Sequence, residues 1–246
     1  MTGALQAIVF DFDGVIANSE PLHLTAFQRA LADDGLDLTA ADYFTRYLGY
    51  DDVGMFQTYA RDRRLTWSRE HVAALVVRKG RVLETLLDTG SVLFPGAKQF
   101  VQAAAAVVPI AIASGAQRHE IDEIIEGAGL SALFATIVAA GDTPESKPSP
   151  APYRLAFQRL CAATGLGLDP LRCVAIEDSR WGIESALGAG LRCVGVTNSY
   201  PADALGGAEL VVPGLGDLTL QALDRLCRSQ RQSSVNPVGG PVRQDG

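Results

Sequence analysis

Short apolar segments alternate with longer amphipathic ones along most of the chain. The short runs lack a regular polar alternation, which is typical of strands buried on both faces. They are Ala7–Phe10, Pro109–Ala113, Thr136–Ala139, Cys173–Ile176, Cys193–Val196 and Leu210–Val212. Apolar residues at helical spacing predict helices near 96–107, 117–127, 150–163, 180–189 and 216–228. This alternation predicts an α/β fold with a parallel sheet that helices cover on both faces.

Residues 16–90 interrupt this alternation. No strand pattern occurs there, and apolar residues recur at helical spacing near its end, at Val72, Leu75, Val76, Val82, Leu83, Leu86 and Leu87. We therefore predict a helical domain at 16–90, inserted into a core formed by residues 1–15 and 91–228. Residues 229–246 are rich in Gln, Ser, Gly and Pro, which predicts a disordered tail.

Composition narrows the class of protein. The 246 residues carry a formal net charge of −7 and are 48% hydrophobic, so we expect a globular protein whose partners include neither nucleic acid nor membrane. The longest apolar run, residues 103–113, is about half of the roughly 20 residues that a membrane span needs. The first basic residue is Arg29, which argues against a secretory signal. The four cysteines form no CxxC pair, so we expect reduced thiols in a cytoplasmic monomer.

Two acidic pairs follow predicted strands. Asp11 and Asp13 come directly after the first strand, and residues two apart in an extended segment point to the same side. Glu177 and Asp178 follow another strand, and the carboxyl ends of parallel strands are where ligands bind. Oxygen-only ligands favour a hard cation such as Mg²⁺. Capping of the following helix explains one pair equally well, but two pairs at matching places favour the metal.

A phosphate-binding pattern accompanies the acids. Ser114 and Gly115 end a strand just before a predicted helix, where a hydroxyl and free backbone N–H groups suit a phosphate. An ordinary strand-to-helix turn explains these two residues equally well. The chain has three lysines, Lys79, Lys98 and Lys147. Since arginine serves nearly everywhere else, a retained lysine indicates a need for a compact charge, and Lys147 is placed to neutralise the acids and a phosphate.

Two residues of the predicted helical domain have more than one interpretation. Lys79 lies on the apolar stripe of its helix, so its ammonium either extends to the edge of that stripe or faces a polar cleft. His23 shares a helical face with Phe27 and Ala30. A structural histidine is the default interpretation, although His23 would lie close to the hinge between the two domains.

Taken together, these motifs resemble a known family. Residues 11–15 (DFDGV), Ser114-Gly115, Lys147-Pro148 and 177–179 (EDS) occur in the order and at the spacing of the haloacid dehalogenase (HAD) superfamily of phosphotransferases. The resemblance is to its β-phosphoglucomutase-like phosphatases with a helical cap, and it covers residues 5–228. It implies a Rossmann-like, HAD-like core with an inserted α-helical cap domain.

The resemblance implies roles for the acids. Asp11 would be the nucleophile that forms an aspartyl-phosphate, and Asp13 the general acid and base. Mg²⁺ would bind the Asp11 carboxylate, the Asp13 backbone carbonyl and Asp178, with Glu177 nearby or bound through water. These roles agree with the pattern, because a carboxylate attacking a dianionic phosphate needs its charge offset.

The resemblance also implies substrate contacts. Ser114, the Gly115 N–H and Lys147 would hold the transferring phosphoryl group. His23 and Lys79 match hinge and cap positions that are associated with closure over the substrate.

From this resemblance we expect a Mg²⁺-dependent phosphatase that acts on a small phosphorylated metabolite, with a sugar phosphate as the first choice. The alternative is a mutase that moves phosphate within a sugar. Mutases of this type grip the second phosphate with basic residues in a cap loop, and residues 48–53 instead carry Asp51 and Asp52, with Arg46 nearby. Asp13 argues against dehalogenation. A signalling domain phosphorylated on Asp11 and a non-catalytic phosphosugar sensor are further alternatives, which the inserted domain and the pair Asp11 and Asp13 disfavour.

Overall fold

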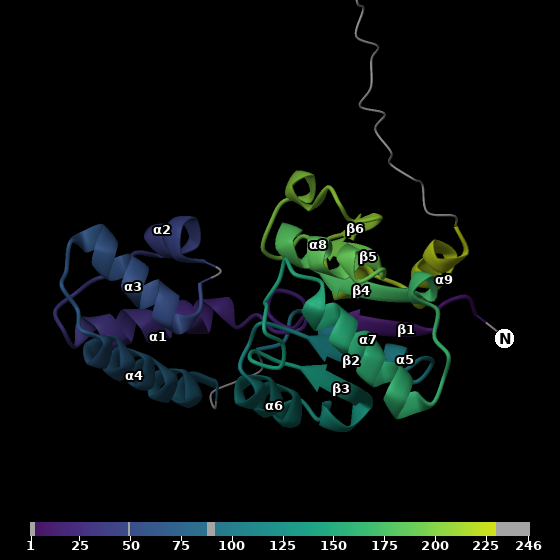
Figure 1. Cartoon of the computed structure of the whole chain (residues 1–246), viewed down its shortest axis with the longest axis horizontal. Helices are drawn as coiled ribbons and strands as arrows, with labels where there is room; N and C mark the ends of the chain where they lie inside the picture. Colours follow the sequence, from purple (N-terminus) through teal and green to yellow (C-terminus); the bar gives the residue numbers. More distant parts are fainter. Residues whose placement is uncertain (1–2, 49, 88–91, 230–246) are drawn as a thin grey trace, which may run out of the picture.

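The core is a six-stranded parallel sheet in the order β3-β2-β1-β4-β5-β6 (Figure 1). The computed structural model describes residues 3–48, 50–87 and 92–229. The strands are β1 (Ala7–Phe10), β2 (Ile110–Ala113), β3 (Phe134–Val138), β4 (Cys173–Glu177), β5 (Arg192–Val196) and β6 (Leu210–Val212). The predicted fold class is therefore confirmed, because each short apolar run lies in a strand of one parallel sheet.

Helices cover both faces of this sheet. One face packs against α5 (Ala97–Ala105), α6 (Arg118–Gly127) and α9 (Leu220–Arg228). The other packs against α7 (Ala151–Thr164) and α8 (Arg180–Gly188). Short 3₁₀ turns occur at Ser131–Leu133, Pro170–Arg172, Ala202–Leu205 and Leu215–Asp217.

The two faces of the sheet differ in side-chain size. Ile8 and Phe10 of β1 face α5, α6 and α9, and the ring of Phe10 meets that of Phe100 edge-on at 6.2 Å. Ala7 and Val9, the alternate residues, face α7 and α8. The same alternation of large and small residues runs through β2 and β4. Every residue of these three strands is buried, because helices cover both faces of the sheet.

The first four helices that follow β1 form a separate lobe, which we call the cap (Figure 1). They are α1 (Glu20–Ala32), α2 (Ala40–Asp42), α3 (Asp52–Arg63) and α4 (Arg69–Leu87), with a π-helical turn at Tyr43–Tyr47. Their apolar faces form a core of their own, in which Phe27 of α1 packs edge-on against Phe56 of α3 at 5.2 Å. Because the cap buries its own apolar surface, it needs little of the sheet for stability.

Two linkers join the cap to the sheet, and they pair with each other. Ala17 forms an antiparallel bridge with Leu93, the Asn18 N–H donates to the Val92 carbonyl at 2.6 Å, and the Phe94 N–H donates to the Ile16 carbonyl at 3.0 Å. Ile16 and Ala17 are fully buried and pack with the sheet. The second predicted boundary, at 90 and 91, lies outside the described residues.

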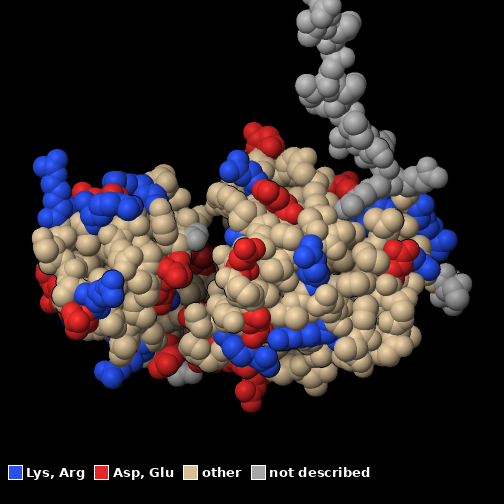
Figure 2. All heavy atoms as spheres, in the orientation of Figure 1, with Lys and Arg blue, Asp and Glu red and all other residues tan. Residues whose placement is uncertain are grey.

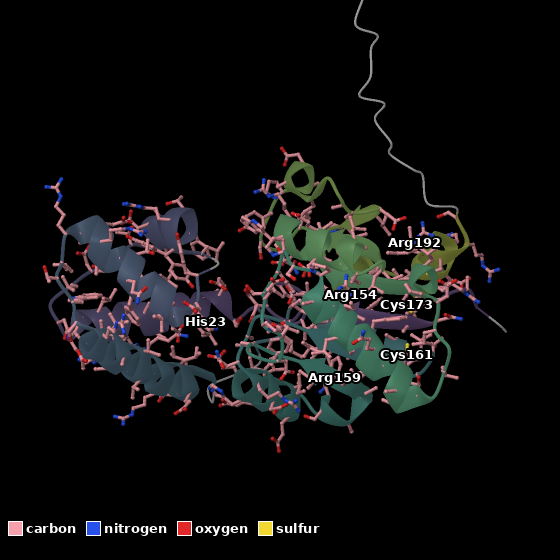
Figure 3. The ribbon with its side chains drawn as sticks, in the orientation of Figure 1. His23, Arg154, Arg159, Cys161, Cys173 and Arg192 are labelled. Carbon is pink, nitrogen blue, oxygen red and sulfur yellow. The ribbon has the colours of Figure 1, made fainter. Side chains whose placement is uncertain are left out.

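The predicted tail begins at Ser229. Arg192 of β5, which is labelled in Figure 3, donates hydrogen bonds to the carbonyl (2.7 Å) and the hydroxyl (3.1 Å) of Ser229. Residues 230–246 lie outside the described residues. Among the helices that the structure describes, none combines the length and the apolar character that a bilayer crossing requires.

Candidate active site

The acidic residues meet at the carboxyl ends of β1 and β4, the two central strands. The Asp11 N–H donates to the Ile176 carbonyl at 2.9 Å and so extends the pairing of these strands by one residue. This places Asp11 beside Glu177 and Asp178, and each of the three acids has an oxygen within 4.8 Å of the others. Three of the four acids that the sequence predicts therefore lie together, and we call Asp11, Glu177 and Asp178 the carboxylate cluster.

Lys147 supplies the positive charge of this cluster. Its Nζ lies 2.8 Å from Asp11 Oδ1 and 2.6 Å from Glu177 Oε1, and its side chain is only 14% exposed. The ammonium also lies 5.0 Å from the centre of the Tyr153 ring. Lys147 comes from the loop between β3 and α7, so three separate segments of the chain fix its position.

Glu177 is fully buried and both of its oxygens are occupied. Oε1 accepts hydrogen bonds from Lys147 and from the Tyr153 hydroxyl at 2.8 Å. Oε2 accepts from the N–H of Asp178 and from the N–H and hydroxyl of Ser179, at 3.2 to 3.4 Å. A Cβ on Gly182 would lie 1.9 Å from this carboxylate, so the first turn of α8 passes close to it only because residue 182 is glycine. Glu177 therefore acts as an anchor for Lys147.

Asp178 is held from the neighbouring strand. Its Oδ2 accepts a short hydrogen bond from the Ser199 hydroxyl, and Asn198 donates to the carbonyl of Gly14 at 2.7 Å. Gly14 has φ of 77°, and a Cβ there would lie 1.8 Å from Asp178 Oδ2. The turn after Asp13 thus requires glycine for its left-handed backbone and for its close approach to Asp178.

The cluster carries more negative than positive charge. Burial and the neighbouring Glu177 charge raise the pKa of Asp11 well above its ordinary value, although Lys147 opposes this. The same two causes raise the pKa of Asp178 to about 7. Three carboxylates against one ammonium leave an excess that a divalent cation would offset.

The oxygens of the cluster also fit a cation. Within the described chain, Asp11 receives its hydrogen bonds on Oδ1 and Asp178 on Oδ2. Each of these two acids therefore has a second oxygen that can turn to a metal, whereas both oxygens of Glu177 are engaged. The donor set, made of oxygens alone, suits Mg²⁺.

Asp13 lies apart from the carboxylate cluster, toward the cap. Its Oδ1 accepts a short hydrogen bond from the Ser19 hydroxyl, one residue before α1. Burial is the main reason why the pKa of Asp13 is raised to about 6, and the charges of Glu20 and Glu120 act in the same direction. The hydrogen bond from Ser19 lowers the pKa and opposes this effect. A carboxyl with this pKa exchanges a proton readily near neutral pH.

Ser114 and Gly115 follow β2, the strand beside β1. The Ser114 hydroxyl accepts a hydrogen bond from the Ala116 N–H at 3.0 Å, as in an ordinary strand-to-helix turn. Ser114 is buried and Gly115 is exposed. Since Phe10 pairs with Ile112, these residues lie at the same edge of the sheet as Asp11. A phosphate-binding role for them stays a prediction.

Lys79 neither reaches solvent nor faces an open cleft. Its side chain is 1% exposed, and its Nζ lies 2.8 Å from Asp52 Oδ1 and 2.9 Å from His23 Nδ1. Asp52, which stands where an arginine was expected, neutralises this lysine. Arg46 lies away from them, paired with Asp62 at 2.7 Å. A substrate-binding role for His23 and Lys79 therefore stays a prediction, and in this structure the two bind each other.

Several residues that position the site were not singled out from the sequence. Ser19, Tyr153, Asn198 and Ser199 hold the acids or the turn beside them. Asn198 and Ser199 could have been found, since they follow β5 at the same edge of the sheet. Ser19 and Tyr153 gave no signal, because a serine near a helix start and a tyrosine on an apolar helix face are common.

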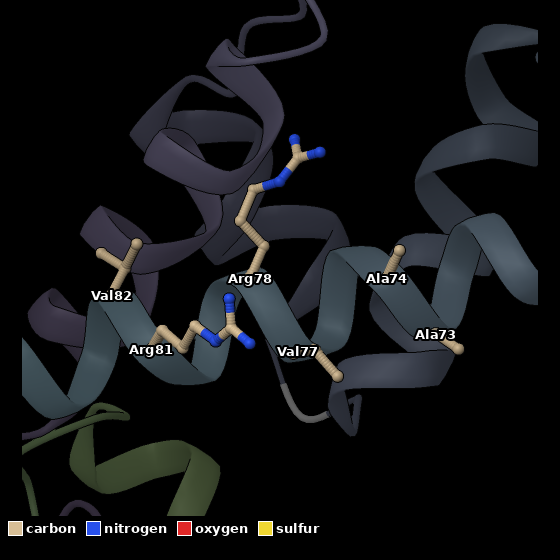
Figure 4. Close-up of a pocket in the computed structure, with 6 residues that line it drawn as sticks. All are labelled: Ala73, Ala74, Val77, Arg78, Arg81 and Val82. Atoms are coloured by element: carbon tan, nitrogen blue, oxygen red, sulfur yellow. The ribbon is translucent and has the colours of Figure 1, made fainter.

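Acidic side chains border the hollow between the two lobes on both sides (Figure 2). A separate hollow of about 540 Å³ lies on the side of α4 (Figure 4) and has no acid among the residues that line it. These residues are Ala73, Ala74, Val77, Arg78, Arg81 and Val82. The chemistry described above therefore lies between the lobes rather than in the hollow on α4.

Comparison with known proteins agrees with this geometry. Residues 5–190, which include the whole carboxylate cluster and the cap, match the haloacid dehalogenase-like hydrolases. The chain belongs to this family. The match confirms the predicted HAD-like fold and the predicted hydrolase class.

Two curated relatives are similar to this chain over most of its length. Protein CbbY of Rhodobacter capsulatus is 31% identical over 90% of this chain and 99% of its own length. A phosphoglycolate phosphatase of Yersinia pestis is 30% identical over 80% of this chain and 83% of its own length.

A solved HAD-like structure has the same architecture. It is a CbbY variant from Rhodobacter sphaeroides in complex with xylulose-(1,5)bisphosphate. It has a TM-score of 0.78 and is 27% identical, covering 89% of this chain and 99% of its own.

Proposed function

We propose that this phosphoric monoester hydrolase is a Mg²⁺-dependent phosphatase that cleaves a small sugar phosphate through an aspartyl-phosphate on Asp11. The observation that carries the proposal is the ion pair between Asp11 and Lys147 inside the carboxylate cluster. A nucleophilic carboxylate, a fixed ammonium and excess negative charge suited to a divalent cation are the elements of phosphoryl transfer. Relatives named as phosphatases support the same reaction.

In the first step, an Asp11 carboxylate oxygen attacks phosphorus as the bond from phosphorus to the ester oxygen breaks. Lys147 offsets the charge of the phosphoryl group, to which Ser114 and the Gly115 N–H donate. The Asp11 and Asp178 carboxylates and the Asp13 carbonyl would hold Mg²⁺, which when bound would offset the remaining negative charge. Glu177 keeps Lys147 in place through the 2.6 Å contact.

Asp13 moves the protons. Protonated Asp13 donates to the departing ester oxygen, and the resulting carboxylate takes a proton from the water that attacks the aspartyl-phosphate. Inorganic phosphate leaves and both aspartates return to their starting state. A pKa of about 6 allows both transfers near neutral pH.

Phosphate release from a panel of small phosphomonoesters, including both anomers of glucose 1-phosphate, tests the proposal. We expect release with Mg²⁺, none with chelator, and a loss of at least about 10⁴-fold in Asp11→Asn, the loss typical of a missing nucleophile. Asp142→Asn, in an exposed ion pair with Arg159, is the matched control and should retain activity. Release that survives in Asp11→Asn would refute the assigned nucleophile.

Conversion of a glucose 1-phosphate to the 6-phosphate, without net release, would establish the mutase instead. The Lys79–Asp52 pair supports the phosphatase over the mutase, because it removes a free cation from the cap.

The cytoplasm remains the proposed compartment, which the four free cysteines support.

A further inference from the structure

A group of titratable side chains occupies the end of the cap nearest the sheet. His23 lies on this end of α1 (Figure 3), and Lys79 of α4 contacts both His23 and Asp52. The Tyr43 hydroxyl donates to Glu20 Oε1 at 2.5 Å. These residues come from four segments of the cap, and we call them the cap polar cluster.

The cap polar cluster is continuous with the catalytic end of the sheet. Glu20 directly follows Ser19, whose hydroxyl donates to Asp13. The Tyr43 hydroxyl reaches Glu20 from the π-helical turn, so the cluster adjoins the residue that follows Ser19. The cluster therefore borders the space that the leaving group of a phosphate ester would occupy beyond Asp13.

The charge of this cluster is neutral or negative. Lys79 and Asp52 cancel, and burial followed by the Lys79 charge lowers the pKa of His23 to about 3, so the imidazole is neutral near pH 7. Burial raises the pKa of Glu20. With Glu20 protonated the cluster is neutral, and with Glu20 ionised it is negative. In neither case does it offer an anion an uncompensated positive charge.

Three further cations of the cap are engaged elsewhere. In the described part of the cap, three arginines form ion pairs at 2.7 to 3.3 Å: Arg46 with Asp62, Arg63 with Asp37 and Arg78 with Asp34. Arg46 is 51% exposed and also lies over the ring of Tyr47, which fixes it on the side of Asp62.

We propose that the Lys79–Asp52 pair makes this enzyme select phosphate esters whose leaving group is uncharged, and reject those that carry a second phosphate. The inference rests on the proposed function and specifies its substrate class as the monophosphate of a neutral sugar or polyol. Asp52, 30% exposed, covers the buried Lys79 and can accept hydrogen bonds from hydroxyl groups. A second phosphate would face the carboxylate of Asp52, while the charge of Lys79 is already paired. The relative solved with xylulose-(1,5)bisphosphate shows that the same architecture can hold two phosphates, so the preference concerns side chains rather than fold.

The test compares kcat/KM for matched pairs of one sugar with one or two phosphates: glucose 6-phosphate with glucose 1,6-bisphosphate, and ribulose 5-phosphate with ribulose 1,5-bisphosphate. We expect the wild-type enzyme to favour the monophosphate by about tenfold or more. Asp52→Asn frees the Lys79 charge and should shift this ratio toward the bisphosphate by about tenfold.

Asp51→Asn is the matched control. Asp51 is in the same loop, and its Oδ1 accepts from the Gly54 N–H at 2.7 Å, a helix cap that asparagine can also make. We expect the ratio in this variant to stay within about twofold of wild type. The double variant Asp52→Asn/Lys79→Met removes both charges and should return the ratio to the wild-type value.

Two outcomes would overturn the inference. One is a wild-type enzyme that handles bisphosphates as well as monophosphates, a comparison that needs no variant. The other is an equal shift of the ratio in Asp51→Asn and Asp52→Asn, which would show a general effect of loop charge.

Equilibrium binding in the Asp11→Asn background separates this inference from the proposed function. If no ester is hydrolysed, the proposed function fails, and the ratio of the two dissociation constants still measures the preference. A bisphosphate bound as tightly as its monophosphate would refute it there as well.

Discussion

The protein holds two lysines in largely buried ion pairs, and the two differ in their surroundings. Lys147 faces Asp11 and Glu177 within a cluster of three acids. Lys79 faces one acid, Asp52, and a neutral histidine. The first site has excess negative charge, and we propose that a phosphate shares its lysine. In the second site the lysine is buried and Asp52 balances its charge. A buried lysine therefore indicates a binding site only where its partners leave a charge uncompensated.

This comparison predicts that the loss of Lys147 lowers catalysis far more than the loss of Lys79. Lys147→Met should lower kcat by roughly 10²–10³-fold or more, since it removes a fixed charge from the transition state. Initial rates of phosphate release at saturating substrate and Mg²⁺ measure this. Lys98→Met is the control, because Lys98 lies on the exposed side of α5. Equal losses of kcat in Lys147→Met and Lys79→Met would show that the two lysines do not differ in their effect on catalysis.

Removing Lys79 should instead affect stability. Breaking a fully buried ion pair costs roughly 3–5 kcal/mol, and we expect about 2–3 kcal/mol for Lys79→Met because the side chain of Asp52 is 30% exposed. Urea unfolding measures the change. Arg46→Met, which breaks an exposed pair, should cost about 1 kcal/mol or less. A Lys79→Met protein as stable as the wild type would show that the pair contributes little.

Glu177 can be displaced without changing any charge. In Gly182→Ala the new Cβ would lie 1.9 Å from the Glu177 carboxylate, so the anchor of Lys147 must move. We expect kcat to fall by about 10²-fold, the effect of roughly 1 Å of misplacement in a catalytic group. Gly127→Ala is the control, since a Cβ at Gly127 meets nothing within 4 Å. Full activity in Gly182→Ala would mean that Lys147 does not depend on this anchor.

The smallest effect concerns Asp13, the proposed proton donor. Ser19→Ala removes a hydrogen bond that stabilises ionised Asp13, so the pKa of Asp13 should rise above about 6. Leaving-group protonation needs the protonated form, and so activity that declines as pH rises through this pKa should decline at a higher pH in the variant. A displacement of up to about one pH unit is expected in the kcat profile, equivalent to about 1.4 kcal/mol. An unmoved or lowered limb would contradict the assignment of Asp13 as the acid.

The sheet and the acids could be predicted from the sequence, whereas the cap contacts could not. Each strand lies within two residues of its apolar run, because burial on both faces leaves an uninterrupted signal. Asp11, Glu177 and Asp178 adjoin such strands, so the topology alone brings them together. The pair of Lys79 and Asp52 joins α4 to the first residue of α3, and only the packing of α1, α3 and α4 determines that contact.

The place of β1 in the sheet has a consequence for biosynthesis. This strand is translated before the other strands of the sheet, and its partners are β2, which begins at Ile110, and β4, which begins at Cys173. The cap is complete in the nascent chain well before either partner, and its contacts are mostly between α1, α3 and α4. The strand that precedes Asp11 therefore stays unpaired until its partners are translated, and Asp11, the proposed nucleophile, becomes fixed only after most of these residues have been made.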